Sequence, residues 1–253
     1  MLKIENLKCS LSNKTIIDNI SLDLNSGVLY CVIGRNGSGK STLFKTIDCL
    51  VPSDGNIIYD DIDIKQLNIK NRAKYISYLP QTRPLPNISV RLMVEHGRFP
   101  HLGFSKTLSE NDYKIVEESI KKVGLENLKY KNLCNISGGE LQKVYIASTL
   151  AQESKVLLLD EPTTHLDLES QIDILNIIKE INDKDKTIIV ILHDLLQAFS
   201  FFDYIFIVDD GKIIDSGKPE ELYKNENIKK IFNVHLEKED KENALYKYKI
   251  MNY

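Results

Sequence analysis

The sequence predicts an α/β fold with a mostly parallel sheet and one helical insertion. Two short runs, residues 156–159 and 188–192, are wholly apolar, as expected for strands buried on both faces of a parallel sheet. Between them, residues 174–181 carry isoleucine and leucine at helical spacing. Strands that alternate with helices in this way are typical of an α/β architecture.

The N-terminal part predicts β structure, followed by a strand, a glycine-rich turn and a helix. Apolar and polar residues alternate on both sides of a polar turn at residues 12–14, which indicates β-strands. Residues 28–33 predict a short apolar strand, and residues 40–50 carry apolar side chains at helical spacing. A further β segment is expected over residues 55–64.

The stretch over residues 82–152 has a different character and predicts the helical insertion. Within it, apolar residues at helical spacing lie between Ser109, a candidate N-cap, and Gly124, a candidate helix stop. The residues that follow this stretch return to the alternation of strand and helix. We therefore expect the insertion to interrupt a single α/β domain.

The C-terminal part predicts a hairpin and a short helix. Asp210-Gly211 lies between two apolar runs, a strong hairpin signal, and Pro219 is well placed to begin a helix. The chain has 253 residues, and a domain has about 150 on average, so one large domain or two small ones are allowed. We expect one domain over residues 1–232, and a charged tail of low order over residues 233–253.

The composition is that of an ordinary globular protein, with 42% hydrophobic and 27% charged residues and a net charge of −3. The near-neutral charge argues against a nucleic-acid partner, because duplex-binding proteins usually carry a strongly basic face. No apolar run approaches the roughly 18 to 20 residues needed to cross a bilayer. The N-terminus lacks the apolar segment of a signal peptide. We therefore expect a soluble protein that stays in the cytoplasm.

The strongest motif is Gly-Arg-Asn-Gly-Ser-Gly-Lys-Ser at residues 34–41, which fits G-x-x-x-x-G-K-[ST]. Its glycines let backbone N–H groups face a phosphate chain, and the following helix adds the positive end of its dipole. Lys40 is expected to reach the β- and γ-phosphates, and Ser41 to supply an oxygen to Mg²⁺. The expected nucleotide-binding residues here are Gly34, Asn36, Gly37, Ser38, Gly39, Lys40, Ser41 and Thr42.

Two adjacent carboxylates, Asp160 and Glu161, end the apolar strand at residues 156–159. At the carboxyl edge of a parallel sheet, such residues point into the ligand crevice. Asp160 suits a role in holding Mg²⁺. Glu161 is a candidate general base that polarises the attacking water.

A third motif, Ile-Ser-Gly-Gly-Glu-Leu-Gln-Lys at residues 136–143, precedes a predicted helix. Ser137, Gly138 and Gly139 are expected to form a bare helix N-terminus, which would be a second anion site. If one ATP is bound by both helix ends, either the chain folds back on itself or a partner chain supplies the second end.

With these motifs in this order, the chain resembles the ATP-binding subunit of an ABC transporter. The family order is matched by the P-loop at 34–42, Gln81 in Tyr-Leu-Pro-Gln, the signature at 136–142, the carboxylates at 160–161, the D-loop at 163–167 and His193. The resemblance covers residues 2 to about 232. It implies a P-loop NTPase (RecA-like) core with a mostly parallel sheet, an N-terminal antiparallel β subdomain and an α-helical insert.

The resemblance also implies ATP and Mg²⁺ as cofactors and assigns site residues. The catalytic residues would be Glu161, His193, Gln81 and Lys40, and the metal residues would be Ser41, Gln81 and Asp160. His193 would contact the γ-phosphate, and Gln81 would link the metal site to the helical insert. The family usually has an aromatic residue that stacks on adenine where this chain has Leu11.

The family implies a dimer of two such chains facing head to tail. Each ATP would lie between Lys40 of one copy and Ser137, Gly138 and Gly139 of the other, which explains two anion sites in one chain. Further partners would be integral membrane permease subunits and, indirectly, an extracytoplasmic substrate-binding protein. The chain would then lie at the cytoplasmic face of the cell membrane.

Three segments, residues 95–101, 109–112 and 162–171, resemble importers of iron chelates (siderophores), haem and cobalamin. Zinc and manganese importers share part of this pattern and remain an alternative. A soluble ABC ATPase, such as an iron–sulfur assembly factor, is a second alternative, and a small-molecule kinase is a third. DNA-repair and translation ATPases fit poorly, because the stretch after Gln81 is too short for a long coiled coil and the chain has one P-loop.

Overall fold

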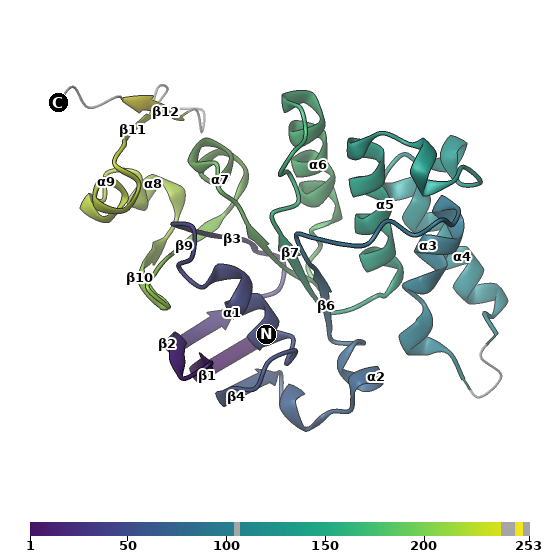
Figure 1. Ribbon diagram of the computed structural model, residues 1–253, viewed down its shortest axis with the longest axis horizontal. Coiled ribbons are helices and arrows are strands. Elements are labelled where there is room, and N and C mark those ends of the chain that lie inside the picture. The colour runs from purple at the N-terminus through teal and green to yellow at the C-terminus, as the bar shows by residue number, and fades with distance from the viewer. Residues whose placement is uncertain (104–106, 239–245, 250–253) are drawn as a thin grey trace.

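The computed structural model describes residues 1–103, 107–238 and 246–249 (Figure 1). The strands are β1 (Leu2–Leu11), β2 (Lys14–Leu24), β3 (Leu29–Gly34), β4 (Asp54–Tyr59), β5 (Ile62–Asp63), β6 (Ile76–Leu79), β7 (Val156–Asp160), β8 (Thr187–Ile191), β9 (Tyr204–Asp209), β10 (Lys212–Gly217), β11 (His235–Lys238) and β12 (Tyr246–Lys249). The α-helices are α1 (Lys40–Ile47), α2 (Ile69–Arg72), α3 (Val90–His96), α4 (Glu110–Lys122), α5 (Gly138–Ala151), α6 (Leu168–Ile181), α7 (Leu195–Phe201), α8 (Pro219–Leu222) and α9 (Glu226–Phe232). Short 3₁₀ helices are η1 (Ile64–Gln66), η2 (Phe99–His101), η3 (Glu126–Leu128) and η4 (Leu133–Asn135).

The central sheet has the strand order β10-β9-β3-β8-β7-β6. Its strands are parallel except for β10, which pairs with β9 in the antiparallel sense. Along β7, Leu157 and Leu159 enter one hydrophobic core, whereas Val156 and Leu158 enter the other. The prediction of a parallel-dominated sheet buried on both faces is therefore confirmed.

The two cores divide the molecule into layers. One core lies between the central sheet and the side that carries α3, α4, α5, α6 and α7. The other lies on the opposite face, where α1 packs between the central sheet and a second sheet of order β2-β1-β4-β5 (Figure 1). This arrangement holds α1, and the loop before it, against the carboxyl end of β3.

The N-terminal sheet is antiparallel throughout, as expected. The turn between β1 and β2 places Ser12 and Asn13 in the left-handed region, with φ of 49° and 62°. Two consecutive residues in this region match the twist of a tight hairpin. Asp210 and Gly211 repeat the arrangement, with φ of 43° and 74°, between β9 and β10, so the predicted hairpin is confirmed.

The helices of the predicted insertion, α3, α4 and α5, lie together at one end of the molecule (Figure 1). Ser109 caps α4 in a capping box with Asp112, and Gly124 follows the helix with φ of 71°. Both end signals that the sequence predicted are therefore present. The α3–α4–α5 group is called the helical insertion below.

Arg98 joins the helices of this insertion from within. Its side chain is buried, and its Nε donates to Asp112 Oδ1 of α4 over 2.8 Å. Its Nη1 donates to the carbonyl oxygen of Ala151, which ends α5, and to Glu153 Oε2, over 2.6 and 2.8 Å. The neighbouring Gly97 lies so close to α5 that a Cβ there would come within 2.2 Å of the Ser148 carbonyl oxygen. Gly97 and Arg98 therefore have a structural role in the motif at residues 95–101.

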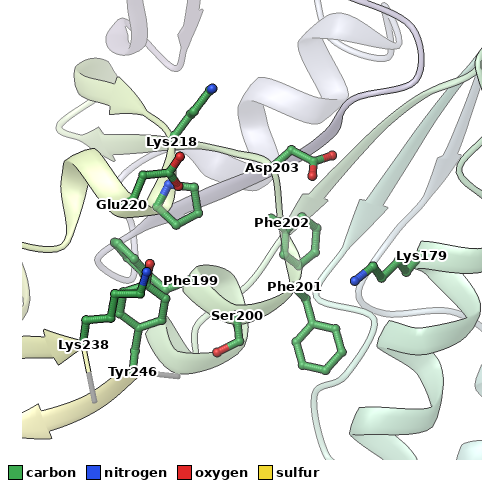
Figure 2. Close-up of a pocket in the computed structure, with 11 residues that line it drawn as sticks. Lys179, Phe199, Ser200, Phe201, Phe202, Asp203, Lys218, Glu220, Lys238 and Tyr246 are labelled. Atoms are coloured by element: carbon green, nitrogen blue, oxygen red, sulfur yellow. The ribbon is translucent and has the colours of Figure 1, made fainter. Parts of the chain in front are cut away.

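The prediction of low order for residues 233–253 is wrong for the part of this tail that the structure describes. There, β11 and β12 form an antiparallel pair. Leu236 and Tyr246 are buried, and the ring of Tyr246 packs edge-on against Phe199 of α7, with centroids 5.4 Å apart (Figure 2). Period-two alternation puts Leu236 and Tyr246 on the same face of the pair, and Glu237 and Lys247 on the opposite face. Residues 239–245 and 250–253 of the tail lie outside the described residues.

None of the helices in the described ranges is long and apolar enough to span a membrane.

Candidate active site

The structure brings most of the predicted site residues around one open cleft of about 470 Å³. The cleft is lined by Ile16, Asn36, Gly37, Gly39, Lys40, Ser41, Thr42, Gln81, Glu161 and His193. These residues come from β2, the loop before α1, the first turn of α1, and the segments that follow β6, β7 and β8. A larger cleft of about 640 Å³, between α7 and the C-terminal strands, contains none of the P-loop residues (Figure 2).

The P-loop connects the end of β3 to the N-terminus of α1. Gly37 and Gly39 have φ of 78° and 103°, a backbone conformation that favours glycine. Gly34 has no room for a side chain, since a Cβ there would lie 2.1 Å from the carbonyl oxygen of Val208 in β9. Gly39 is the N-cap of α1 and supplies no side-chain cap, which leaves the helix N-terminus suited to an anion.

Lys40 and Ser38 provide polar groups inside this loop. The buried Nζ of Lys40 donates to the carbonyl oxygens of Gly34 and Arg35, each over 2.9 Å. Burial lowers the pKa of Lys40, and the nearby charges of the two carboxylates oppose this shift. The Oγ of Ser38 is buried and has no hydrogen-bond partner among the described residues. Lys40 and the uncapped N-terminus of α1 line the cleft, and a cation beside free backbone N–H groups suits a phosphate chain, so the loop fits a nucleotide.

Asp160 and Ser41 form the candidate metal site. Asp160, at the end of β7, is 1% exposed, and its Oδ1 accepts a hydrogen bond from Ser41 Oγ over 3.1 Å. Burial raises the pKa of Asp160, and hydrogen bonds from Ser41 and Tyr78 act in the opposite direction. A hydroxyl and a carboxylate are hard oxygen donors of the kind that Mg²⁺ prefers. The residues therefore fit this cation.

The side chain of Glu161 contacts residues from the segments that follow β6, β7 and β8. Its Oε2 accepts hydrogen bonds from Gln81 Nε2 and, over 3.1 Å, from Thr164 Oγ1, and its Oε1 contacts His193 Nε2. The backbone of Glu161 has φ of 52°, an uncommon conformation that costs energy and is found at functional sites. Gln81 therefore contacts the candidate base directly, whereas its role at the metal stays a prediction.

Ser137, Gly138 and Gly139 lie outside this cleft, at the start of α5. The expectation of a bare helix end is wrong, because Ser137 and Glu140 form a capping box. The N–H of Ser137 donates to Glu140 Oε2 over 2.7 Å, and the N–H of Glu140 donates to Ser137 Oγ over 3.2 Å. The Ser-x-x-Glu spacing is itself the sequence signal for such a box. The hydrogen bonds of this box do not involve the backbone N–H groups of Gly138 and Gly139.

Leu11, at the position where the family usually has an aromatic residue, ends β1 and is 39% exposed. The apolar residue that lines the cleft from this part of the chain is Ile16 of β2. An isoleucine offers an apolar surface to a base but no aromatic ring.

Two contacts of the site were not predicted from the sequence. Tyr78 Oη donates to Asp160 Oδ2 over 3.0 Å, although Tyr78 was noted only as part of the motif that contains Gln81. Arg35, the second residue of the P-loop, donates from Nε and Nη2 to the carbonyl oxygens of Ile231 and Lys230, over 2.6 and 2.9 Å. Both contacts join segments that are distant in the sequence.

Comparison with known proteins agrees with this geometry. The sequence model of the ABC transporter family matches residues 17–164. The chain is 36% identical over 233 residues to the probable siderophore transport system ATP-binding protein YusV of Bacillus subtilis (strain 168), which covers 91% of this chain and 85% of that protein. It is 34% identical over 234 residues to the ferric enterobactin transport ATP-binding protein FepC of Escherichia coli (strain K12), covering 91% and 86%.

A solved structure gives the same result for the fold. The dimeric, post-hydrolysis structure of the ATP-binding cassette MJ0796 bound to ADP and Pi superimposes with a TM-score of 0.75 at 27% identity, covering 87% of this chain and 99% of that one. The family match includes the P-loop and the two carboxylates. The chain therefore belongs to the ABC transporter family, as one of its ATP-binding subunits that hydrolyse ATP.

Proposed function

We propose that this chain hydrolyses ATP to power the import of an iron complex, such as a siderophore or haem, or of cobalamin, through a separate membrane permease. The observation that carries the proposal is the extent of the similarity to YusV and FepC, each aligned over 91% of this chain. The names of these two proteins specify siderophore and ferric enterobactin transport.

In the proposed reaction, the P-loop amides and Lys40 bind the phosphates, and Glu161 accepts a proton from the attacking water. Bound Mg²⁺ would neutralise phosphate charge, held by Ser41 and Asp160. Both oxygens of Glu161 contact groups of the chain itself. We propose that Gln81 and His193 turn from Glu161 toward the nucleotide when it binds, which leaves the carboxylate more open to the attacking water.

The proposed assembly is a head-to-tail homodimer. Cassettes of this family dimerise, and MJ0796 was solved as a dimer. We place each ATP between Lys40 of one copy and Ser137, Gly138 and Gly139 of the other. Two features support this arrangement: the signature residues lie outside the cleft of their own chain, and the capping box does not use the amides of Gly138 and Gly139. The first turn of α5 thus retains N–H groups for a phosphate.

The proposed place of the dimer is the cytoplasmic face of the cell membrane, bound to two permease subunits. An extracytoplasmic substrate-binding protein would deliver the cargo and would not touch this chain. No nucleic acid takes part. The net charge of −3 supports the last point, since nucleic-acid-binding domains are usually basic.

Isolation of the native membrane complex tests this proposal. A tagged copy of the chain would be purified from its own membranes in mild detergent, and its partners and bound cargo identified by mass spectrometry. We expect an integral permease, with an iron complex or cobalamin as cargo. A zinc or manganese permease would refute the cargo, and recovery with soluble assembly proteins alone would refute the transport function.

A further inference from the structure

The carboxylate of Asp160 is held from two sides by hydroxyl groups. Ser41 Oγ donates to Oδ1 over 3.1 Å, and Tyr78 Oη donates to Oδ2 over 3.0 Å. Asp160 is almost fully buried, so few other groups compete for its oxygens. The two bonds together fix the rotation of the carboxylate about its Cβ–Cγ bond, because each oxygen has its own donor in a different direction.

The position of Tyr78 is set by the sheet. Tyr78 lies in β6, which pairs in parallel with β7, and its Cα is opposite that of Leu158, two residues before Asp160. Its ring packs edge-on against Phe44 of α1, with centroids 6.4 Å apart. Because the strand and the helix both restrain the ring, the hydroxyl is held close to Oδ2 before any ligand arrives.

We propose that Tyr78 is a positioning residue for the metal-binding carboxylate: its hydroxyl occupies Oδ2 and turns Oδ1 toward Ser41 and the cation. This inference rests on the proposed role of Ser41 and Asp160 in holding Mg²⁺. Groups that orient a metal-binding carboxylate typically change metal affinity by about 10- to 100-fold when they are removed. Loss of the Tyr78 hydroxyl therefore weakens binding of the cation more than binding of the nucleotide.

A packing role for the same ring predicts a different result. The variant Tyr78→Phe keeps the ring and its contact with Phe44 and removes only the donor to Asp160. If the ring alone matters, this variant binds the cation as the original chain does. The matched control is Tyr75→Phe, since Tyr75 lies just before β6 and packs against Tyr59, away from the cleft.

The experiment measures binding of Mn²⁺, a spectroscopic probe for Mg²⁺, to the full chain with a non-hydrolysable ATP analogue. Free Mn²⁺ is followed by electron paramagnetic resonance, and analogue affinity is measured separately in EDTA. We expect Tyr78→Phe to bind Mn²⁺ at least about 10-fold more weakly, with unchanged analogue affinity in EDTA. Tyr75→Phe should match the original chain in both measurements.

Two results would overturn the inference: Mn²⁺ affinity that is unchanged in Tyr78→Phe, or a parallel loss of analogue affinity in EDTA, which would indicate general loosening of the cleft. Failure of the proposed metal site itself is distinguishable, because the original chain would then bind no Mn²⁺ beyond the amount that the analogue binds without protein. In that case the proposal for Tyr78 falls with it.

Discussion

Replacement of Arg98 by methionine should lower the free energy of unfolding by about 3 to 4 kcal/mol. Methionine keeps much of the side-chain volume and removes the guanidinium that joins α3, α4 and α5. Loss of one partner from a buried ion pair costs about 3 to 5 kcal/mol, because the remaining charge stays buried. Two details place the expected loss in the lower part of this range.

The first detail is that Asp112 keeps other donors, since the N–H and Oγ of Ser109 both donate to its Oδ2, over 2.9 and 2.6 Å. The second is that the side chain of Glu153 is 50% exposed, and an exposed ion pair contributes at most about 1 kcal/mol. The main loss is therefore at Asp112 Oδ1 and the Ala151 carbonyl, which would be left without the Arg98 donor.

Urea unfolding followed by far-ultraviolet circular dichroism measures this effect, since the chain has no tryptophan for fluorescence. The matched control is Arg91→Met in α3, whose ion pairs with Glu95 and Glu117, over 2.9 and 3.6 Å, are partly exposed. Each exposed pair contributes at most about 1 kcal/mol, so the control should lose less than Arg98→Met. The double variant Arg98→Met/Asp112→Asn should recover part of the loss, because the unpaired charge is gone. If Arg98→Met were no more destabilising than the control, the structural role of Arg98 would be refuted.

Three further predictions concern the site and its supports. Glu161→Gln should lower ATP turnover at least about 100-fold while ATP binding is retained; turnover at the original rate would exclude Glu161 as the general base. Gly34→Ala should abolish ATP binding in an equilibrium fluorescence assay, because its Cβ would lie 2.1 Å from a carbonyl oxygen of β9; normal binding would contradict the close approach. Hydrogen bonds from Ser109, and then Arg98, lower the pKa of Asp112 to about 2, against about 3.9 in unfolded chains. Its contribution to stability is therefore complete above about pH 4 and lost as the pH falls toward 2, and Asp112→Asn should remove this part of the acid-induced loss in pH-dependent unfolding.

Local sequence patterns predicted the P-loop and five strands of the central sheet, but not the sixth, the edge strand β6. Buried strands such as β7 and β8 must be apolar on both faces, so they appear as continuous apolar runs. Gly37 and Gly39 have positive φ, and this constraint acts within a few residues. Such features can be recognised without knowledge of the rest of the fold.

Contacts between distant segments could not be predicted in the same way. The order of strands places Tyr78 beside β7 and Val208 beside Gly34, but no local pattern encodes which strands are neighbours. Arginine is usually exposed at the surface. Arg98 is buried only because α4 and α5 pack around it. The contacts of these residues depend on how distant segments pack, and the periodicity of a single segment does not predict that packing.

Two errors had signals in the sequence. The Ser137-x-x-Glu140 spacing is a capping-box pattern, although the two glycines between these residues suggest a bare helix end. In the C-terminal strands, Leu236 and Tyr246 alternate with charged residues, and the high charge of the tail obscured this alternation. The first pattern belongs to the N-terminus of α5, and the second belongs to the paired strands β11 and β12.

The central claim is that ATP hydrolysis at Lys40 and Glu161 drives import of an iron complex. The most direct measurement reconstitutes the chain with its permease and binding protein in liposomes and follows uptake of a radiolabelled ferric siderophore together with phosphate release. The account predicts uptake that requires ATP and Mg²⁺ and is lost, with phosphate release, in Glu161→Gln. Uptake that continues in Glu161→Gln, or ATP hydrolysis that moves no iron complex, haem or cobalamin, would contradict it.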